Sequence, residues 1–194
     1  MPSSKIQPAI ELSLPATLRA DDPAASQAAH DEVLLLFDEC GTGLRRYLSS
    51  FGLGAAATDD LLQDVFMSLF RHLRLGRPRT NLKGWLFQVG HNLALKQRQK
   101  GLKRQQTESD WDTVVAERAI DPSANPEEQL AGDRRRQRLR AVVRALPERD
   151  RRCLYLRAEG LSYRDIARTL DISLGSVAKS LTRAVTRLTT VDTR

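Results

Sequence analysis

The residues from Leu161 to Leu188 form a helix-turn-helix pattern close to the C-terminal end. Ser162 can cap the first helix, and Asp165 three residues later completes a capping box. A short turn follows at 170–172, and Ser173 can cap the second helix. Apolar side chains recur every three or four residues in that second helix, at Val177, Leu181, Ala184 and Leu188. This spacing predicts a helix that is buried on one face.

The opposite face of the second helix carries hydroxyl and cationic groups: Ser176, Lys179, Arg183 and Arg187. Such groups suit the base edges and phosphates of a DNA major groove. An ordinary amphipathic surface helix would show the same periodicity. Two capped helices joined by a turn of this length are harder to obtain by chance, so the pattern favours a contact with duplex DNA.

Basic and acidic residues alternate in blocks along the chain. The formal net charge of +7 divides into −5 over residues 1–60, +7 over 61–110, −5 over 111–133 and +10 over 134–194. Two separate basic blocks predict two contacts with a polyanion, and the second block contains the helix-turn-helix pattern. The alternative is that the two basic blocks are solvent-exposed faces that bind no polyanion.

The composition favours aliphatic helical cores. Hydrophobic residues make up 41% of the 194 residues and aromatic residues only 5%, and no segment alternates convincingly as a strand. The sequence has no apolar run of about 18 residues that would span a membrane, and its N-terminus lacks the apolar stretch of a signal peptide. Cys40 and Cys153 are far apart in sequence and are expected to be buried. We therefore expect a cytoplasmic protein.

Turn-forming and acidic segments divide the chain into two helical parts. Residues 1–28 are rich in Pro, Ala and Ser and are expected to form a disordered tail. Residues 105–128 lose helical periodicity and are expected to form a flexible acidic linker. The expected helices begin near Asp31, at an N-cap Thr58, at Leu82 (ending near Lys100), near Glu127 (ending at Ala145) and at Pro147. The sequence thus predicts an all-α protein with two small helical domains, 29–104 and 129–194.

Three segments, in this order, resemble the extracytoplasmic-function (ECF, group 4) sigma factors of the sigma-70 family. DDLLQDVFMSLFRHL at 59–73 is similar to the family's region 2.2 helix. NLKGWLFQVGHNLALKQRQK at 81–100 resembles the W-L-x-x-x-x-x-N-x-A stretch of regions 2.3 and 2.4, and residues 145–188 are similar to region 4. The resemblance implies a region 2-like helical bundle and a region 4-like helix-turn-helix in a non-catalytic subunit that directs RNA polymerase to promoters.

The resemblance implies that the 59–73 helix binds core RNA polymerase. Its partner would be the clamp coiled coil of the largest subunit, and the flap region of the second subunit would contact the region 4-like domain. The core-binding candidates are Asp59, Asp60, Gln63, Asp64 and Met67. Carboxylates near a helix N-terminus also stabilise the helix dipole, which is the alternative explanation for them. Whether an anti-sigma factor is a further partner is left open, and no membrane insertion is expected.

The resemblance also implies that the segment around the 82–100 helix holds the promoter's −10 element as a melted strand. A loop pocket would capture an unstacked base and cations would hold the backbone. Asn92 matches the family's polar Asn, which can hydrogen-bond a base edge, whereas Trp85 is expected to pack in the core. The −10 candidates are Arg79, Lys83, Trp85, His91, Asn92, Lys96, Arg98 and Lys100.

The region 4-like domain is implied to read the −35 element as duplex. The candidates for this contact are Arg164, Ser173, Ser176, Lys179, Arg183 and Arg187. The family usually carries cations at the positions held here by Ala178, Ser180 and Val185. These departures predict either weaker −35 binding or a different set of bases, with Lys179 compensating in part.

Other function classes fit the sequence less well. A stand-alone helix-turn-helix transcriptional regulator with a helical sensor or dimerisation domain is the main alternative, and the basic segment 81–104 in the other domain argues against it. A second alternative is an adaptor protein that has the same fold but does not bind DNA. An enzyme is disfavoured because the sequence shows no HExxH, P-loop or nucleophile-elbow motif, and His30, His72 and His91 are scattered. No cofactor or metal site is expected.

Overall fold

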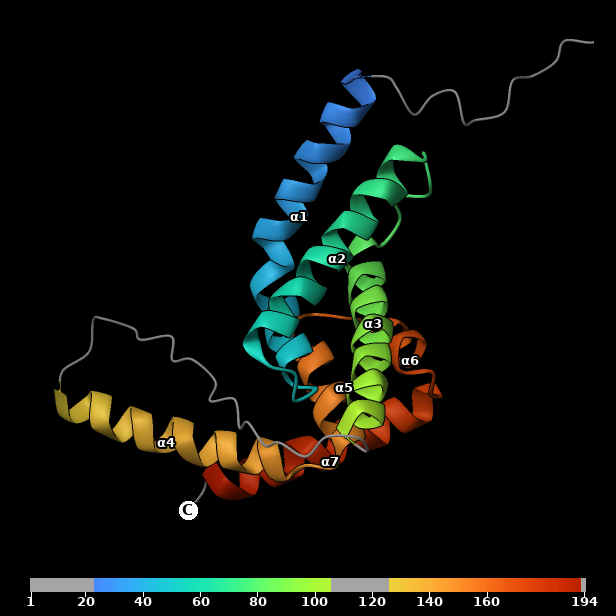
Figure 1. Cartoon of the computed structure of the whole chain (residues 1–194). Helices are drawn as coiled ribbons and strands as arrows, with labels where there is room; N and C mark the ends of the chain where they lie inside the picture. The colour runs from blue at the N-terminus through green and yellow to red at the C-terminus, as the bar shows by residue number, and fades with distance from the viewer. Residues whose placement is uncertain (1–22, 106–125, 193–194) are drawn as a thin grey trace, which may run out of the picture.

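The computed structural model describes residues 23–105 and 126–192, and every regular element within these ranges is an α-helix. The helices are α1 (Pro23–Ser49), α2 (Ala55–Arg74), α3 (Leu82–Gln105), α4 (Pro126–Ala145), α5 (Glu148–Ala158), α6 (Tyr163–Leu170) and α7 (Leu174–Asp192). Helices α1 to α3 form an N-terminal bundle, and α4 to α7 form a C-terminal bundle (Figure 1). The expected all-α class with two helical domains is confirmed.

The first helix starts earlier than the sequence predicts. It begins at Pro23 rather than near Asp31, so residues 23–28, expected as part of a tail, are helical. The remainder of the predicted tail, residues 1–22, lies outside the described residues. The prediction for 23–28 fails because these residues, mostly Ala and Ser, provide little apolar periodicity, although Ala is the strongest helix former.

The second and third helices also differ from prediction at one end each. Gly54 rather than Thr58 is the N-cap of α2. The Thr58 hydroxyl donates to the carbonyl oxygen of Gly54 at 3.0 Å, inside the first turn, which is a common alternative use of a threonine side chain. Helix α3 continues past Lys100 to Gln105. Residues 106–125 of the predicted linker lie outside the described residues.

The N-terminal bundle is held together by apolar side chains that recur every three or four residues along its helices. Helix α2 buries Leu61, Leu62, Val65, Phe66 and Leu69. They pack on the C-terminal half of α1, where Tyr47 is fully buried. Helix α3 crosses α1 at Gly90, where an added Cβ would lie 3.1 Å from the Leu44 side chain and 3.4 Å from that of Leu48. The absence of a side chain at Gly90 therefore permits the close approach of α3 to α1.

The C-terminal bundle centres on the helix-turn-helix. Leu156, Ile166 and Val177 are fully buried where α5, α6 and α7 meet. The thiol of Cys153 is buried in this bundle and that of Cys40 in the other, as expected, and neither forms a disulfide. Within the described ranges, no helix is long and apolar enough to cross a membrane.

The two bundles contact each other, which the sequence did not indicate. Helix α3 packs against α6, and α1 packs against α5. The Asn81 amide, which precedes α3, donates to the Asp165 carboxylate of α6 at 2.6 Å. The Arg98 guanidinium of α3 pairs with the Glu148 carboxylate at the start of α5. The interface therefore joins the start and the C-terminal half of α3 to two helices of the other bundle.

Arg152 of α5 also contacts the N-terminal bundle. Its guanidinium donates to Glu148 at 2.6 Å and stacks over the Phe51 ring of the N-terminal bundle, 4.3 Å from the ring centroid. Close by, an added Cβ at Gly43 would lie only 1.9 Å from the Glu159 carboxylate. A residue with a side chain at Gly43 would thus displace Glu159 from its place between the bundles.

Candidate polymerase and nucleic-acid interfaces

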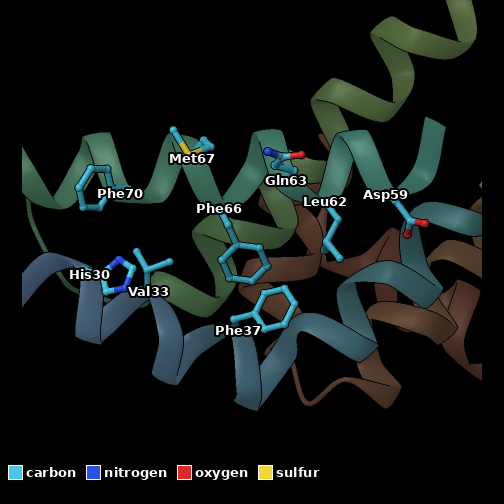
Figure 2. Close-up of a pocket in the computed structure, with 9 residues that line it drawn as sticks. All are labelled: His30, Val33, Phe37, Asp59, Leu62, Gln63, Phe66, Met67 and Phe70. Atoms are coloured by element: carbon cyan, nitrogen blue, oxygen red, sulfur yellow. The ribbon is translucent and has the colours of Figure 1, made fainter. Parts of the chain in front are cut away.

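An apolar groove of about 440 Å³ lies between α1 and α2 (Figure 2). Three of the five core-binding candidates line it, namely Asp59, Gln63 and Met67. The rings of Phe37 and Phe66 meet edge to face in the groove wall, with centroids 5.0 Å apart. Phe37 is 47% exposed. The remaining wall is His30, Val33, Leu62 and Phe70.

The acidic candidates stand on the exposed side of α2. Asp59 pairs with Arg45 at 2.7 Å, and this hydrogen bond lowers the pKa of the Asp59 carboxyl. Asp60 and Asp64 are exposed and make no ion pair with another side chain in the described part of the chain. Met67 is 44% exposed beside them. Helix α2 thus offers unpaired negative charge next to an apolar groove, a combination that suits a protein partner.

Helix α3 presents a polar and cationic row to solvent. Asn92, Lys96 and Lys100 are exposed. They follow one another at intervals of four residues, so they lie on one side of the helix. The row can offer a hydrogen bond to a base edge from Asn92 and two positive charges to a phosphate backbone.

The other cationic −10 candidates are already paired with carboxylates. Arg79 contacts Glu32 at 2.9 Å, and Lys83 contacts Glu39 at 3.5 Å. Arg98 pairs with Glu148 across the bundle interface. All three ion pairs are at least partly exposed, and such pairs contribute little to stability. A phosphate could therefore replace the carboxylate at each of them.

His91 does not lie on the exposed face of α3 with Asn92, Lys96 and Lys100. His91 is only 4% exposed, and its Nδ1 shares a hydrogen bond of 2.7 Å with the Tyr47 hydroxyl. Burial lowers the pKa of His91 to about 4, and the positive charge of Arg152 adds to the effect. The packing of α3 on α1 turns His91 inward. By contrast, Trp85 packs partly buried against the His72 ring at 4.7 Å, in line with its predicted core position.

We expect His91 to make the folding stability depend on pH. Because the pKa of His91 is about 4 in the folded chain and 6.5 in its ordinary state, the unfolded chain binds a proton between these values and the folded chain does not. The free energy of unfolding should be greatest above pH 6.5. It should fall as the pH drops towards 4, by up to about 3 kcal/mol. Urea unfolding across this range measures the loss.

The matched variant for this test is His91→Gln, which keeps a polar group beside Tyr47 but does not titrate. Its stability should decline less steeply than that of the native chain between pH 6.5 and 5, above the range where most carboxylates titrate. Identical pH slopes for the two proteins would contradict the assignment of this loss to His91.

The helix-turn-helix has the caps that the sequence predicts. The Ser162 hydroxyl accepts the Asp165 backbone N–H at 3.2 Å and donates to the Asp165 carboxylate at 2.5 Å. Asp171 adopts a left-handed conformation (φ 51°) in the turn. The Ser173 hydroxyl then accepts the Ser176 backbone N–H at 3.2 Å at the start of α7. These contacts fix where each helix begins, and therefore how α7 is presented.

The −35 candidates differ in whether their side chains are already held by an ion pair. Arg164, Ser173, Lys179 and Arg187 are exposed, and Ser176 is partly buried. Arg183 instead donates to Asp150 through Nε at 2.9 Å and Nη2 at 2.7 Å, and Asp150 is only 1% exposed. The guanidinium lowers the pKa of the Asp150 carboxyl. In this arrangement Arg183 joins α7 to α5, so its predicted role as a DNA-reading side chain is not supported by its contacts.

Sequence reasoning missed the residues that join the two bundles. Glu148, Arg152 and Asp165 looked like ordinary surface or capping residues, and Asn81 like the start of a helix. Their partners lie up to 84 positions away in the chain, as for Asn81 and Asp165. No local pattern indicates such a contact. Within the described ranges, no group of His, Cys, Asp and Glu side chains is arranged to hold a metal ion.

Comparison with known families identifies both bundles. Residues 36–104 match the family model for sigma-70 region 2, and residues 136–188 match that for sigma-70 region 4. Two solved structures share the fold. They are the sigma factor RpoE with the anti-sigma factor NepR from Bartonella quintana (TM-score 0.63, 24% identity, 84% of this chain and 94% of that one), and CnrH with the cytosolic domain of CnrY (TM-score 0.51, 23% identity, 89% and 96%).

Curated relatives agree with these matches. The ECF RNA polymerase sigma factor SigE of Mycolicibacterium smegmatis is 35% identical over 128 residues, which are 64% of this chain and 48% of that protein. The ECF RNA polymerase sigma-E factor of Escherichia coli is 30% identical over 131 residues, which are 64% of this chain and 68% of that protein. The chain thus spans about half of the first relative and two thirds of the second. It belongs to the extracytoplasmic-function RNA polymerase sigma factors, a family that acts in transcription initiation.

Proposed function

We propose that this chain binds core RNA polymerase and directs it to promoters, with α6 and α7 on the −35 duplex and α3 on the melted −10 strand. The observation that carries the proposal is the presence of three separate exposed surfaces on the segments that match sigma regions 2 and 4. One is acidic and apolar, on α2. The other two are cationic, on α3 and α7.

In this proposal the acidic surface of α2 docks on the clamp coiled coil of the largest polymerase subunit, and the C-terminal bundle contacts the flap region of the second subunit. The chain itself is non-catalytic and works in the cytoplasm, where the polymerase is. One solved neighbour is the sigma factor RpoE in complex with the anti-sigma factor NepR, and we extend control by such a partner to this chain as part of the proposal.

The physical task at the −10 element is to offset the cost of melting. Unstacking a base costs a few kcal/mol, which a hydrogen bond to its edge and cations on the backbone can recover. Asn92 with Lys96 and Lys100 supplies both kinds of contact from one exposed helix face. Two modest contacts on one molecule also raise each other's effective concentration, so that weak −10 and −35 binding add up to tight promoter binding.

Asn92→Ala should weaken promoter opening about tenfold, because one hydrogen-bonded base contact is lost, and should leave binding to core polymerase unchanged. Permanganate reactivity of the melted thymines measures opening, and co-elution with core polymerase measures binding. Gln97→Ala is the matched control, since Gln97 is an exposed amide on another side of α3. Unchanged opening in Asn92→Ala, or a loss of polymerase binding, would contradict the proposed role.

A further inference from the structure

The outward side of α7 carries a row of methyl-bearing side chains. Leu174 and Val185 are 49% and 50% exposed. Ala178 is partly buried and Thr182 is exposed between them. At 100° of rotation per residue, these four positions fall within one quarter of the helix circumference. The row lies beside the buried stripe of α7.

One arginine of α7 that could read guanine is engaged with a carboxylate of the protein. A bidentate contact with guanine O6 and N7 needs two donors of one guanidinium fork. Arg183 already uses Nε and Nη2 on the buried Asp150 carboxylate. Helix α7 therefore has fewer free guanine-reading groups than its sequence suggests.

The charge around the row fits a polyanion better than an apolar protein surface. Lys179 is exposed next to Ala178, and Arg187 and Arg164 are exposed further along α7 and on α6. This combination of exposed methyl groups and cations suits the DNA major groove. The phosphates on either side of the groove attract the cations, and the base edges within it include one apolar group, the 5-methyl of thymine.

We propose that Ala178 and Thr182 determine −35 specificity by contacting thymine 5-methyl groups, with Lys179 as a donor to a neighbouring base. This inference rests on the proposed function. Both residues lie in the first half of α7, and the N-terminal part of a recognition helix is the part that contacts base edges. The −35 element of this chain is therefore marked by thymines at the positions that these two residues face.

The test compares thymine with deoxyuridine, which lacks only the 5-methyl group. The full chain is assembled with core RNA polymerase, and duplexes randomised in the upstream region are selected for binding. The enriched −35 sequence is then resynthesised with each thymine replaced in turn by deoxyuridine. We expect about a fourfold loss of affinity at the thymine that faces Thr182, the effect of one buried methyl group.

Thr182→Ser removes the matching methyl group from the protein and keeps the hydroxyl. This variant should bind the thymine and deoxyuridine duplexes equally at that position. Thr186→Ser, the same change one turn further along α7 on an exposed residue, should keep the fourfold preference. Circular dichroism checks that both variants retain the helical fold.

Each outcome bears on a different claim. If the assembled polymerase enriches no sequence, the proposed function itself fails. If it enriches a −35 sequence without thymine, or one that tolerates deoxyuridine at every position, the methyl readout is overturned and the proposed function stands. A thymine preference that Thr182→Ser leaves unchanged at every position would overturn the assignment to this residue.

Discussion

Replacing Asp60 and Asp64 together by lysine should weaken binding to core RNA polymerase by a factor of about 100 or more. The substitution would place like charges opposite each other at the interface, and this costs several kcal/mol of binding free energy. Both carboxylates are exposed on α2, next to the groove lined by Phe37 and Phe66. Neither makes an ion pair with another described side chain, so their charge is available to a partner. Titration of labelled chain with core polymerase measures the loss.

The control for this variant carries the same change in net charge elsewhere. Asp31 and Asp38 are exposed on α1 and do not line the groove. Their double replacement by lysine should leave polymerase binding within about threefold, since distant exposed charges are screened by salt. Equal weakening by the two double variants would show a general charge effect and would contradict docking through α2.

Arg183→Met should lower the free energy of unfolding by about 3 kcal/mol, because it leaves the Asp150 carboxylate buried without its guanidinium. Asp150 is 1% exposed, whereas the Arg183 side chain is 47% exposed. Asp150→Asn should therefore cost less, about 1 kcal/mol, since the remaining guanidinium can still reach water. Urea unfolding of both variants and of the double variant gives the coupling between the two residues.

This measurement separates a structural role from a DNA-reading role. A structural Arg183 predicts a large loss of stability that the double variant partly restores. If Arg183→Met instead kept native stability and only weakened duplex binding, the ion pair would be incidental, and Arg183 would return to the DNA-reading residues of α7.

Local features of the sequence predicted most of the helices and the helix-turn-helix. Capping by Ser162 and Ser173 and the buried stripe that includes Val177 depend on residues three or four positions apart, and the structure shows them as predicted. The errors at Pro23 and Thr58 are errors of helix ends, where several residues can serve as caps.

The site was less predictable, because its side chains depend on contacts between helices. His91 is polar and stands beside the exposed Asn92, yet the crossing of α3 over α1 buries it. In the sequence, Arg183 is one of several cations of α7, whereas in the structure it donates a hydrogen bond to Asp150 of α5. The pairing of Arg98 with Glu148 likewise depends on how the two bundles meet. Such contacts leave no periodic signal in the chain.

The most direct test of the account is run-off transcription with purified core RNA polymerase and this chain on fragments of its native genome. We expect RNA with defined 5′ ends that requires both components, and little duplex binding by the chain alone. RNA no different from that made by core polymerase alone, or tight duplex binding without polymerase, would contradict the claim that this chain selects promoters as part of the polymerase.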